Sequence, residues 1–387
     1  MKIAVFTDTY LPQINGVVTS TVTFVREFEK MGHEVLIIAP QLKGAKESTS
    51  KVWRLPAFPF PFQPEYNIVA PISKELVTFK SLKIDLIHAQ TPFSMGLLAL
   101  YFGKRFKIPV VHTYHTFFVE YAHYVPVLPQ RLVKELAKFK WFCNSCEYLV
   151  VPTKRMAEKL PEYGIETPMQ VIPTGIDLAE IRKSTAKEVK EFRAVYDIAP
   201  NKKVLIFVGR IGKEKNVFFL LDSFVKILKK VPNTVLFIAG DGPEREHLER
   251  KARELGVFEN IIFAGYVDHQ KIFVAFKMAD VFVFPSKTET QGLVLLEGLA
   301  AGTPGVCIDA MGVADILKGS KGGFLTADDL TVYSEKVIEL LNNKNVYEQK
   351  KTEALDVAQK FCAEGLAQKM IKVYQKAILI KKGDKKR

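Results

Sequence analysis

Short apolar segments alternate with longer amphipathic segments along this chain, and the alternation occurs twice. The apolar segments of the first series are KIAVFTD, HEVLIIAP, DLIHAQ and PVVHTYHT. Those of the second series are KVLIFVG, TVLFIAG, IIFAG and VFVFP. Short apolar strands separated by helices are typical of parallel sheets, because parallel neighbours need a long crossover connection. The sequence therefore predicts an α/β protein with two parallel sheets.

A turn-rich stretch, VIPTGIDLAEI, separates the two series and contains Pro173 and Gly175. A charged helical segment follows it, and the second series begins at Lys203. A length of 387 residues also suits two domains of ordinary size. We therefore predict a first domain over residues 1–175 and a second domain over residues 176–361.

The excess positive charge of the C-terminal part lies in the tail, which carries +7 of the formal net charge of +13. The last nineteen residues, KMIKVYQKAILIKKGDKKR, contain eight basic residues and one acidic residue. Such a tail is either an amphipathic helix attracted to anionic lipid head groups or a docked helix with a solvated end, and the sequence leaves both open. Aromatic residues are not interleaved with arginines and no nucleic-acid-binding motif is present, so we expect no nucleic-acid partner.

The N-terminal sequence MKIAVFTD lacks the long apolar core and the cleavage site of a secretory signal. No stretch approaches the roughly 18–20 apolar residues of a membrane span. We therefore expect a cytoplasmic location. Cys143 and Cys146 form the one close cysteine pair, without a second pair or histidines at metal spacing, so we predict core packing and no metal site.

Two loops that follow predicted strands contain candidate phosphate-binding groups. Gly16 directly precedes a helix, where a glycine lets a phosphate approach the helix-start amides. It is a single glycine and not the three-glycine dinucleotide fingerprint, which argues against a nicotinamide enzyme. Arg210 and Lys215 follow a strand of the second series, at the edge where open α/β sheets bind ligands. The two cations either neutralise a leaving diphosphate or belong to a solvated turn.

The most informative segment is PSKTETQGLVLLEGLAAGTP. Glu289 precedes a predicted helix that the amides of Gly292 and Leu293 open. Glu297 lies about one turn inside that helix. Helix-start amides bind phosphate, and carboxylates accept hydrogen bonds from sugar and ribose hydroxyls. The segment therefore predicts a site for a nucleotide-sugar.

The spacing of Glu289 and Glu297, followed by AAGTP, resembles the donor-site signature of the retaining glycosyltransferases of family 4. Arg210 with Lys215, VIPTGID and the opening FTDTYLPQINGVVTS are similar to the same family's pattern, so the resemblance covers nearly the whole chain. It implies the α/β fold called GT-B, in which two Rossmann-like domains with parallel sheets face a central cleft.

The same resemblance implies a role for each part of the chain. Residues 1–175 would bind the acceptor and residues 176–361 the nucleotide-sugar donor, while residues 362–387 would form a helix that returns to the first domain and ends in the basic tail. The candidate catalytic residues are His115, Arg210, Lys215 and Glu289. The candidate donor-binding residues are Gly16, Arg210, Lys215, Glu289, Gly292, Leu293 and Glu297.

Within this set, the resemblance implies that Arg210 and Lys215 hold the donor diphosphate. The backbone amides of Gly16, Gly292 and Leu293 would also contact its phosphates. Glu289 would hold the transferred sugar and Glu297 the ribose. His115, in VVHTYHT, matches the family histidine near the donor sugar. His112, in the same predicted strand, is expected to be an ordinary buried residue.

The NGVVTS loop and the segment HTYHTFFVEYAHY are most similar to glycosyltransferases that glucosylate diacylglycerol. This implies retaining transfer of glucose from UDP-glucose to 1,2-diacylglycerol at the cytoplasmic membrane surface, with no cofactor beyond the nucleotide-sugar co-substrate. No Asp-x-Asp motif is present, so we expect metal-independent transfer in which the cation pair replaces the metal. The oligomeric state is not predicted.

A basic helical segment, PQRLVKELAKFKWF, contains Arg131, Lys134, Lys138 and Lys140 among apolar residues. It suits docking at an anionic membrane, or it is an ordinary surface helix. Two other functions stay open. One is transfer of mannose from GDP-mannose to a phosphoinositide or a soluble sugar, and the other is a non-catalytic lipid- or polyanion-binding protein.

Overall fold

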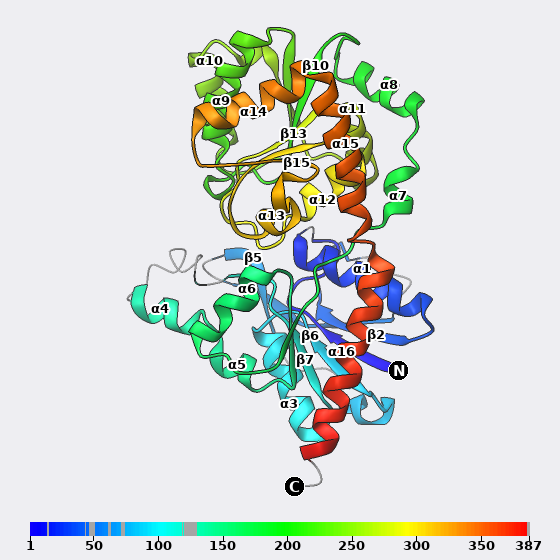
Figure 1. Cartoon of the computed structure of the whole chain (residues 1–387). Helices are drawn as coiled ribbons and strands as arrows, with labels where there is room; N and C mark the ends of the chain where they lie inside the picture. Colours follow the sequence, from blue (N-terminus) through cyan, green and yellow to red (C-terminus); the bar gives the residue numbers. More distant parts are fainter. Residues whose placement is uncertain are drawn as a thin grey trace. The chain divides into compact units, whose positions relative to one another are not determined.

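The structure is a computed structural model that describes residues 1–13, 15–42, 44–45, 51–60, 63–70, 74–117, 119 and 130–384. The chain divides into two compact units (Figure 1). The first unit is Met1–Gly175 together with Ala363–Arg387, and the second is Ile176–Cys362. Each unit is built around one parallel sheet, which confirms the predicted α/β class.

The sheet of the first unit has seven parallel strands in the order β3-β2-β1-β6-β7-β8-β9. Its strands are β1 (Lys2–Phe6), β2 (Glu34–Pro40), β3 (Lys51–Leu55), β6 (Leu86–Ala89), β7 (Val110–Thr113), β8 (Tyr148–Val151) and β9 (Met169–Val171). The inner strands β1, β6, β7 and β8 are almost fully buried, as expected for a parallel sheet covered on both faces, whereas the edge strands β3 and β9 are partly exposed. The strand order reverses between β1 and β6, which is where open α/β sheets bind ligands.

The helices of the first unit are α1 (Gly16–Lys30), α2 (Lys74–Val77), α3 (Ser94–Phe106), α4 (Gln130–Leu136), α5 (Lys140–Asn144), α6 (Lys154–Lys159) and α16 (Ala363–Asp384). A separate antiparallel pair is formed by β4 (Ala57–Phe60) and β5 (Gln63–Val69). Cys143 of α5 and the nearby Cys146 are buried core residues, and burial raises the pKa of the Cys143 thiol to about 12. Among the described residues, no group of histidine, cysteine and acidic side chains could hold a metal ion.

The last helix, α16, belongs to the first unit and contacts α1, β7 and β8. Its buried positions are Ala363, Leu366, Ala367, Met370, Val373, Tyr374 and Ala377, a helical spacing that gives one apolar face. Tyr374 packs against Phe28 of α1, with 5.5 Å between the ring centroids. Lys381 pairs with Glu147 at 2.5 Å. The basic segment is thus a docked helix as far as Asp384, and the last three residues of the tail lie outside the described part.

The second unit has six parallel strands in the order β12-β11-β10-β13-β14-β15. They are β10 (Lys203–Val208), β11 (Thr234–Ala239), β12 (Ile261–Gly265), β13 (Val281–Phe284), β14 (Gly305–Ile308) and β15 (Gly323–Thr326). The helices are α7 (Leu178–Arg182), α8 (Ala186–Val195), α9 (Val217–Lys230), α10 (Arg245–Glu254), α11 (His269–Met278), α12 (Leu293–Ala300), α13 (Met311–Ile316), α14 (Leu330–Asn342) and α15 (Lys344–Gln359). The order reverses between β10 and β13, so the loops that follow these two strands are neighbours.

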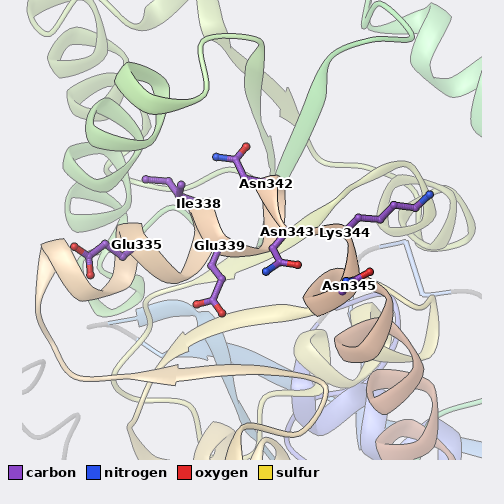
Figure 2. Close-up of a pocket in the computed structure, with 7 residues that line it drawn as sticks. All are labelled: Glu335, Ile338, Glu339, Asn342, Asn343, Lys344 and Asn345. Atoms are coloured by element: carbon purple, nitrogen blue, oxygen red, sulfur yellow. The ribbon is translucent and has the colours of Figure 1, made fainter.

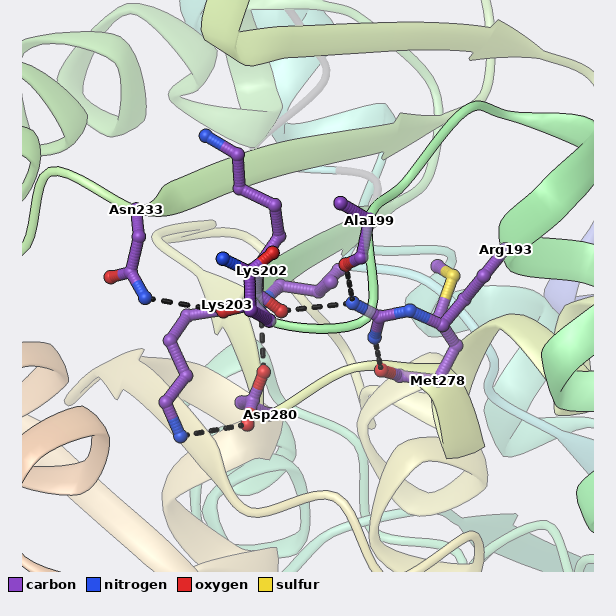
Figure 3. A network of polar contacts seen from close by, with 9 residues as sticks. Arg193, Ala199, Lys202, Lys203, Asn233, Met278 and Asp280 are labelled. Atoms are coloured by element: carbon purple, nitrogen blue, oxygen red, sulfur yellow. Dashed lines mark hydrogen bonds and ion pairs between the residues drawn. The ribbon is translucent and has the colours of Figure 1, made fainter.

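The amino ends of β10 and β13 are held by a polar network (Figure 3). Arg193 of α8 donates hydrogen bonds to the carbonyl oxygens of Ala199 at 2.7 Å and Lys202 at 2.9 Å. The Asp280 carboxylate accepts a hydrogen bond from the Val204 amide at 2.7 Å. This network lies at the opposite end of the strands from the ligand-binding edge, so its role is structural. No helix in the described ranges is long and apolar enough to cross a bilayer.

Candidate functional site

The loops after β10 and β13 are tied to each other. Arg210 is exposed in the β10 loop, and Lys215 ends a short 3₁₀ turn in the same loop. The Asn216 side chain donates a hydrogen bond to the Pro285 carbonyl at the end of β13, at 3.3 Å. The Ser286 hydroxyl donates to the Glu214 carbonyl at 3.3 Å. These contacts hold Lys215 beside the loop that carries Glu289.

Lys215 and Glu289 form an ion pair through Glu289 Oε1. The Ser286 hydroxyl donates to the same oxygen at 3.2 Å, and Lys215 Nζ lies 5.7 Å from the centre of the Phe284 ring. The two charged side chains are only 21% and 16% exposed, so the pair is partly desolvated. The structure thus brings together the predicted diphosphate cation and the predicted sugar carboxylate. A donor diphosphate would compete with Glu289 for Lys215.

A third loop packs closely against the loop after β10. A Cβ atom on Gly240, which has a φ of +145°, would lie 1.9 Å from the Gly209 carbonyl oxygen. The Ile211 amide donates to the Asp241 carbonyl at 2.9 Å, which joins the two loops. Only glycine fits at residue 240, and a side chain there would displace the loop that carries Arg210 and Lys215. The sequence analysis did not single out this glycine, although the pattern AGDG after a strand is a signal for it.

Glu289 is also held through its backbone. Its carbonyl accepts a hydrogen bond from the Gly312 amide of α13 at 2.8 Å. A Cβ atom on Gly312 would lie 2.3 Å from the Thr290 carbonyl oxygen, so α13 can approach this loop only with glycine at residue 312. Sequence reasoning missed Gly312 because its contact is with a loop more than twenty positions away.

Gly292 is the N-cap of α12 and has a left-handed conformation, with Leu293 as the first helical residue. The N-cap glycine has no side chain to cap this helix, and the first turn contains no acidic residue. The N-cap residue therefore leaves the amides at the helix start to other partners, and the helix dipole favours an anion at this end. This arrangement can bind a phosphate group.

Glu297 lies on α12, just past its first turn. Burial raises the pKa of Glu297 to about 7, and the nearby carboxylate of Glu180 on α7 adds to the rise. Near neutral pH this carboxyl group therefore exists in both protonation states. Once ionised, it can accept hydrogen bonds from two vicinal hydroxyls such as those of a ribose.

In the first unit, His115 follows β7 and contacts Gln90, the residue after β6. His115 Nε2 lies 2.8 Å from Gln90 Oε1. Burial lowers the pKa of His115 to about 3, with His112 contributing, so the ring is neutral near pH 7. His112 is fully buried, as predicted, with Nδ1 donating to the Ala89 carbonyl at 2.8 Å.

Gly16 is the first residue of α1 and is exposed. The side chain of the preceding Asn15 caps the helix, because its Oδ1 accepts a hydrogen bond from the Val18 amide at 3.0 Å. Asn15 was not singled out from the sequence, although an asparagine directly before a helix is a capping signal. The Val18 amide is thus already occupied by the capping side chain, and the Gly16 amide precedes it at the helix start.

Asp8, at the end of β1, is a buried carboxylate with a structural role. It accepts hydrogen bonds from the hydroxyls of Thr91 and Ser94 and from the Met95 amide, the last at 3.0 Å. It therefore supplies the cap that α3 lacks on its own N-cap residue, Phe93. Burial raises the pKa of Asp8.

A pocket of about 500 Å³ lies at the junction of α14 and α15, and its lining contains none of the predicted site residues (Figure 2). Its lining residues are Glu335, Ile338, Glu339, Asn342, Asn343, Lys344 and Asn345. Asn343 caps α15 by accepting a hydrogen bond from the Val346 amide at 3.2 Å. The lining is polar with one apolar side chain, unlike the mostly apolar walls of small-molecule sites. We assign it no role.

Two family models match this chain. The model described as Glycosyltransferase Family 4 matches residues 14–180, and the model described as Glycosyl transferases group 1 matches residues 188–356. The first match begins after β1 and covers the other strands of the first sheet, and the second match covers all strands of the second sheet.

Curated relatives include two proteins named alpha-monoglucosyldiacylglycerol synthase. That of Streptococcus pneumoniae is 36% identical over 79% of this chain and 70% of its own length. That of Acholeplasma laidlawii is 34% identical over 79% of each chain. A GDP-mannose-dependent alpha-mannosyltransferase of Corynebacterium glutamicum is 25% identical over 84% of this chain and 76% of its own.

Among solved structures, the Anabaena protein HepE in complex with UDP-glucose matches with a TM-score of 0.78 and 16% identity, over 97% of this chain and 99% of that one. At this identity the match concerns the fold, and it agrees with two parallel-sheet α/β units of the GT-B type. The matches to both family models and to the two synthases agree with the Glu289–Glu297 signature. This chain belongs to glycosyltransferase family 4 and is a glycosyltransferase with the GT-B fold.

Proposed function

We propose that this glycosyltransferase transfers glucose from UDP-glucose to 1,2-diacylglycerol, with retention of the anomeric configuration, at the cytoplasmic face of the membrane. The observation that carries the donor half is the pairing of Lys215 with Glu289 beside the uncapped start of α12. The lipid half is supported by the two relatives named alpha-monoglucosyldiacylglycerol synthase.

In this proposal the second unit binds the donor. The amides of Gly292 and Leu293, together with Lys215 and Arg210, hold the diphosphate, because an uncapped helix start and two cations favour an anion. Glu289 accepts hydrogen bonds from hydroxyls of the transferred sugar. Lys215 is partly desolvated in its ion pair with Glu289, which strengthens its interaction with charge that develops on the leaving diphosphate.

The reaction breaks the bond between the sugar anomeric carbon and the diphosphate oxygen and forms a bond from that carbon to the acceptor oxygen. We propose that the acceptor attacks from the face that the diphosphate leaves, with its proton passing to a leaving phosphate oxygen. The configuration is then retained without a covalent sugar–enzyme intermediate. Arg210 and Lys215 supply the positive charge that a metal ion supplies in other transferases, and no further cofactor takes part.

The first unit presents apolar side chains to solvent along two elements. On α3 and its N-cap, Phe93, Leu97 and Tyr101 are 38%, 51% and 60% exposed at a spacing of four residues, which forms one stripe. Phe93 packs on Phe139, between α4 and α5, with ring centroids 5.4 Å apart. The α3 stripe therefore starts at the α4–α5 junction.

The α4–α5 segment continues this apolar surface. Leu132 and Leu136, one helical turn apart, are 47% and 61% exposed, and Trp141 is 69% exposed. Arg131 and Lys134 are exposed on the same helix. An ordinary surface helix turns its leucines inward, whereas a helix that lies on an anionic membrane exposes apolar and basic residues together. This favours the membrane-docking interpretation of α4 and supports a lipid acceptor.

The test is transfer from a panel of nucleotide-sugars by the full-length chain, with and without vesicles of diacylglycerol in anionic lipid. We expect lipid-dependent release of UDP from UDP-glucose, an α-linked lipid product from the α-linked donor, and the same rate in excess EDTA. Release from GDP-mannose instead would replace the donor and favour a mannosyltransferase, the activity named for the relative from Corynebacterium glutamicum. If no donor is consumed and Glu289→Ala leaves vesicle binding intact, the chain is a binding protein and the proposal is wrong.

A further inference from the structure

A chain of buried hydrogen bonds runs from the last helix to His115. Tyr374 Oη of α16 lies 2.7 Å from His88 Nδ1 on β6. The same Nδ1 lies 3.0 Å from Gln90 Nε2, and Gln90 Oε1 lies 2.8 Å from His115 Nε2. All of these residues belong to the first unit. Tyr374, His88 and Gln90 are 0%, 1% and 4% exposed, so water cannot replace a missing partner.

The direction of each hydrogen bond follows from the Tyr374 hydroxyl. Within the described residues, His88 Nδ1 is the acceptor within hydrogen-bond distance of this hydroxyl, and a buried hydroxyl proton without an acceptor is unfavourable. Tyr374 therefore donates to Nδ1. His88 is neutral, because burial lowers its pKa, so its one ring proton lies on Nε2 and is donated to Thr113 Oγ1 at 2.7 Å.

This tautomer of His88 also orients Gln90. Gln90 Nε2 lies 3.0 Å from His88 Nδ1 and 3.3 Å from His88 Nε2, so the amide group that faces the ring is nearer to its unprotonated nitrogen. An NH₂ group is favourable at this position and a carbonyl oxygen is not, which assigns the NH₂ of Gln90 to the His88 side. The carbonyl oxygen of Gln90 then faces His115 and can only accept. His115 must therefore carry its proton on Nε2, which leaves Nδ1 as an acceptor. If His88 were protonated on Nδ1 instead, the carbonyl oxygen of Gln90 would face His88 and its NH₂ group would face His115. His115 would then carry its proton on Nδ1.

We propose that Tyr374, His88 and Gln90 form a positioning relay that fixes the ring orientation of His115 and its Nε2–H tautomer, so that Nδ1 is kept as a hydrogen-bond acceptor for a substrate hydroxyl. The relay itself is a feature of this unit, whereas the use of Nδ1 by a substrate rests on the proposed function. The relay links α16 to His115, because the hydroxyl of Tyr374 at one end of the hydrogen-bond chain selects the tautomer of His115 at the other end. Tyr374 is held in place by its packing against Phe28 of α1.

The variant that tests the relay is Tyr374→Phe, and Tyr333→Phe is its matched control. Tyr333 is also fully buried, and its hydroxyl donates a hydrogen bond to the Val306 carbonyl of β14 at 3.0 Å and has a backbone hydrogen bond with Phe284. Both variants therefore lose one buried hydroxyl, and Tyr333→Phe loses at least as many hydrogen bonds as Tyr374→Phe, but Tyr333 lies in the second unit and outside the relay. Gln90→Met is a second variant that breaks the relay in its middle.

The first readout needs no substrate. Nitrogen NMR of the full-length chain with ¹⁵N-histidine reports the tautomer of each ring, and His115→Ala identifies the signals of His115. We expect a single Nε2–H form of His115 in the wild type and after Tyr333→Phe, and a mixture of tautomers after Tyr374→Phe or Gln90→Met. An unchanged His115 spectrum in both relay variants would overturn the relay, whether or not the chain transfers glucose.

The second readout is a double-mutant cycle on the kcat of transfer. We expect Tyr374→Phe to lower kcat by about tenfold, the effect of losing one buried hydrogen bond, with little change in KM. In a His115→Ala background the same substitution should have no further effect. An equal loss in both backgrounds would mean that Tyr374 is only structural. If the wild type transfers no glucose from UDP-glucose, the proposed function fails while the NMR result still decides the relay.

Discussion

Glu297→Gln should remove an electrostatic cost of folding and, at the same time, impair donor binding. Burial raises the pKa of Glu297 from 4.5 to about 7, so the ionised form is less stable in the folded chain than in water. Glutamine has nearly the same shape and no charge, so it avoids this cost. The ionised carboxylate, however, is the form that accepts two ribose hydroxyls, and the glutamine amide has only one acceptor oxygen.

The size of the stability effect depends on pH. Below pH 4.5 the carboxyl is protonated in both the folded and the unfolded chain, so it does not change the free energy of unfolding. Between pH 4.5 and 7 the folded chain keeps a proton that the unfolded chain releases, so stability falls as pH rises. Above pH 7 the full cost is present, at most about 3 kcal/mol at 1.36 kcal/mol per pKa unit.

The assay is thermal and denaturant unfolding of the second unit within the full-length chain, at about pH 4 and pH 8.5. We expect Glu297→Gln to match the wild type at about pH 4 and to be more stable by up to about 3 kcal/mol at pH 8.5. Glu254→Gln, the same change at an exposed position of α10, is the control and should have no effect at either pH. Equal stability of Glu297→Gln and wild type at pH 8.5 would refute the reasoning.

Three further predictions concern other parts of the molecule. Lys215→Met should lower kcat for transfer by about 10² or more, because it removes positive charge from the leaving diphosphate, while Lys203→Met at the other end of β10 should leave the rate unchanged in the same UDP-release assay. Gly240→Ala should lower the free energy of unfolding by at least about 2 kcal/mol in urea titrations, because its Cβ would meet a carbonyl oxygen at 1.9 Å; wild-type stability would contradict this. Trp141→Ser should weaken sedimentation with anionic vesicles, whereas Val195→Ser, which removes an equally exposed apolar side chain from the second unit, should not.

Both parallel sheets could be predicted from the sequence because their strands are short, apolar and bounded by turns. The segment KVLIFVG became β10 and TVLFIAG became β11, close to their expected limits. The order of the strands could not be predicted in this way. The position of β6 next to β1 depends on packing between segments more than eighty positions apart, which alternation along the chain does not encode.

The candidate site could likewise be predicted only in part from the sequence. Glu289, Gly292, Leu293 and Glu297 lie within nine consecutive residues, so their common position could be inferred from one segment. The contact of Glu289 with Lys215 joins residues 74 positions apart, and it became visible only in the folded chain. Gln90, His88 and Tyr374 were missed for the same reason, since the last of them lies 286 positions from its partner.

Lys215 and Glu289 pair with each other in the absence of a donor, so a donor that binds Lys215 must replace this ion pair. A partly buried carboxylate or ammonium group is costly when it is alone, and pairing the two lowers that cost. In the proposed function, a nucleotide-sugar would bring a negative diphosphate for Lys215 and hydroxyl groups for Glu289, so each charge would exchange one partner for another. A free nucleotide diphosphate would recruit Lys215 but leave the Glu289 carboxylate without its cation. Under this proposal the ion pair would favour the complete donor over the nucleotide product, which is the discrimination that release of product after transfer requires.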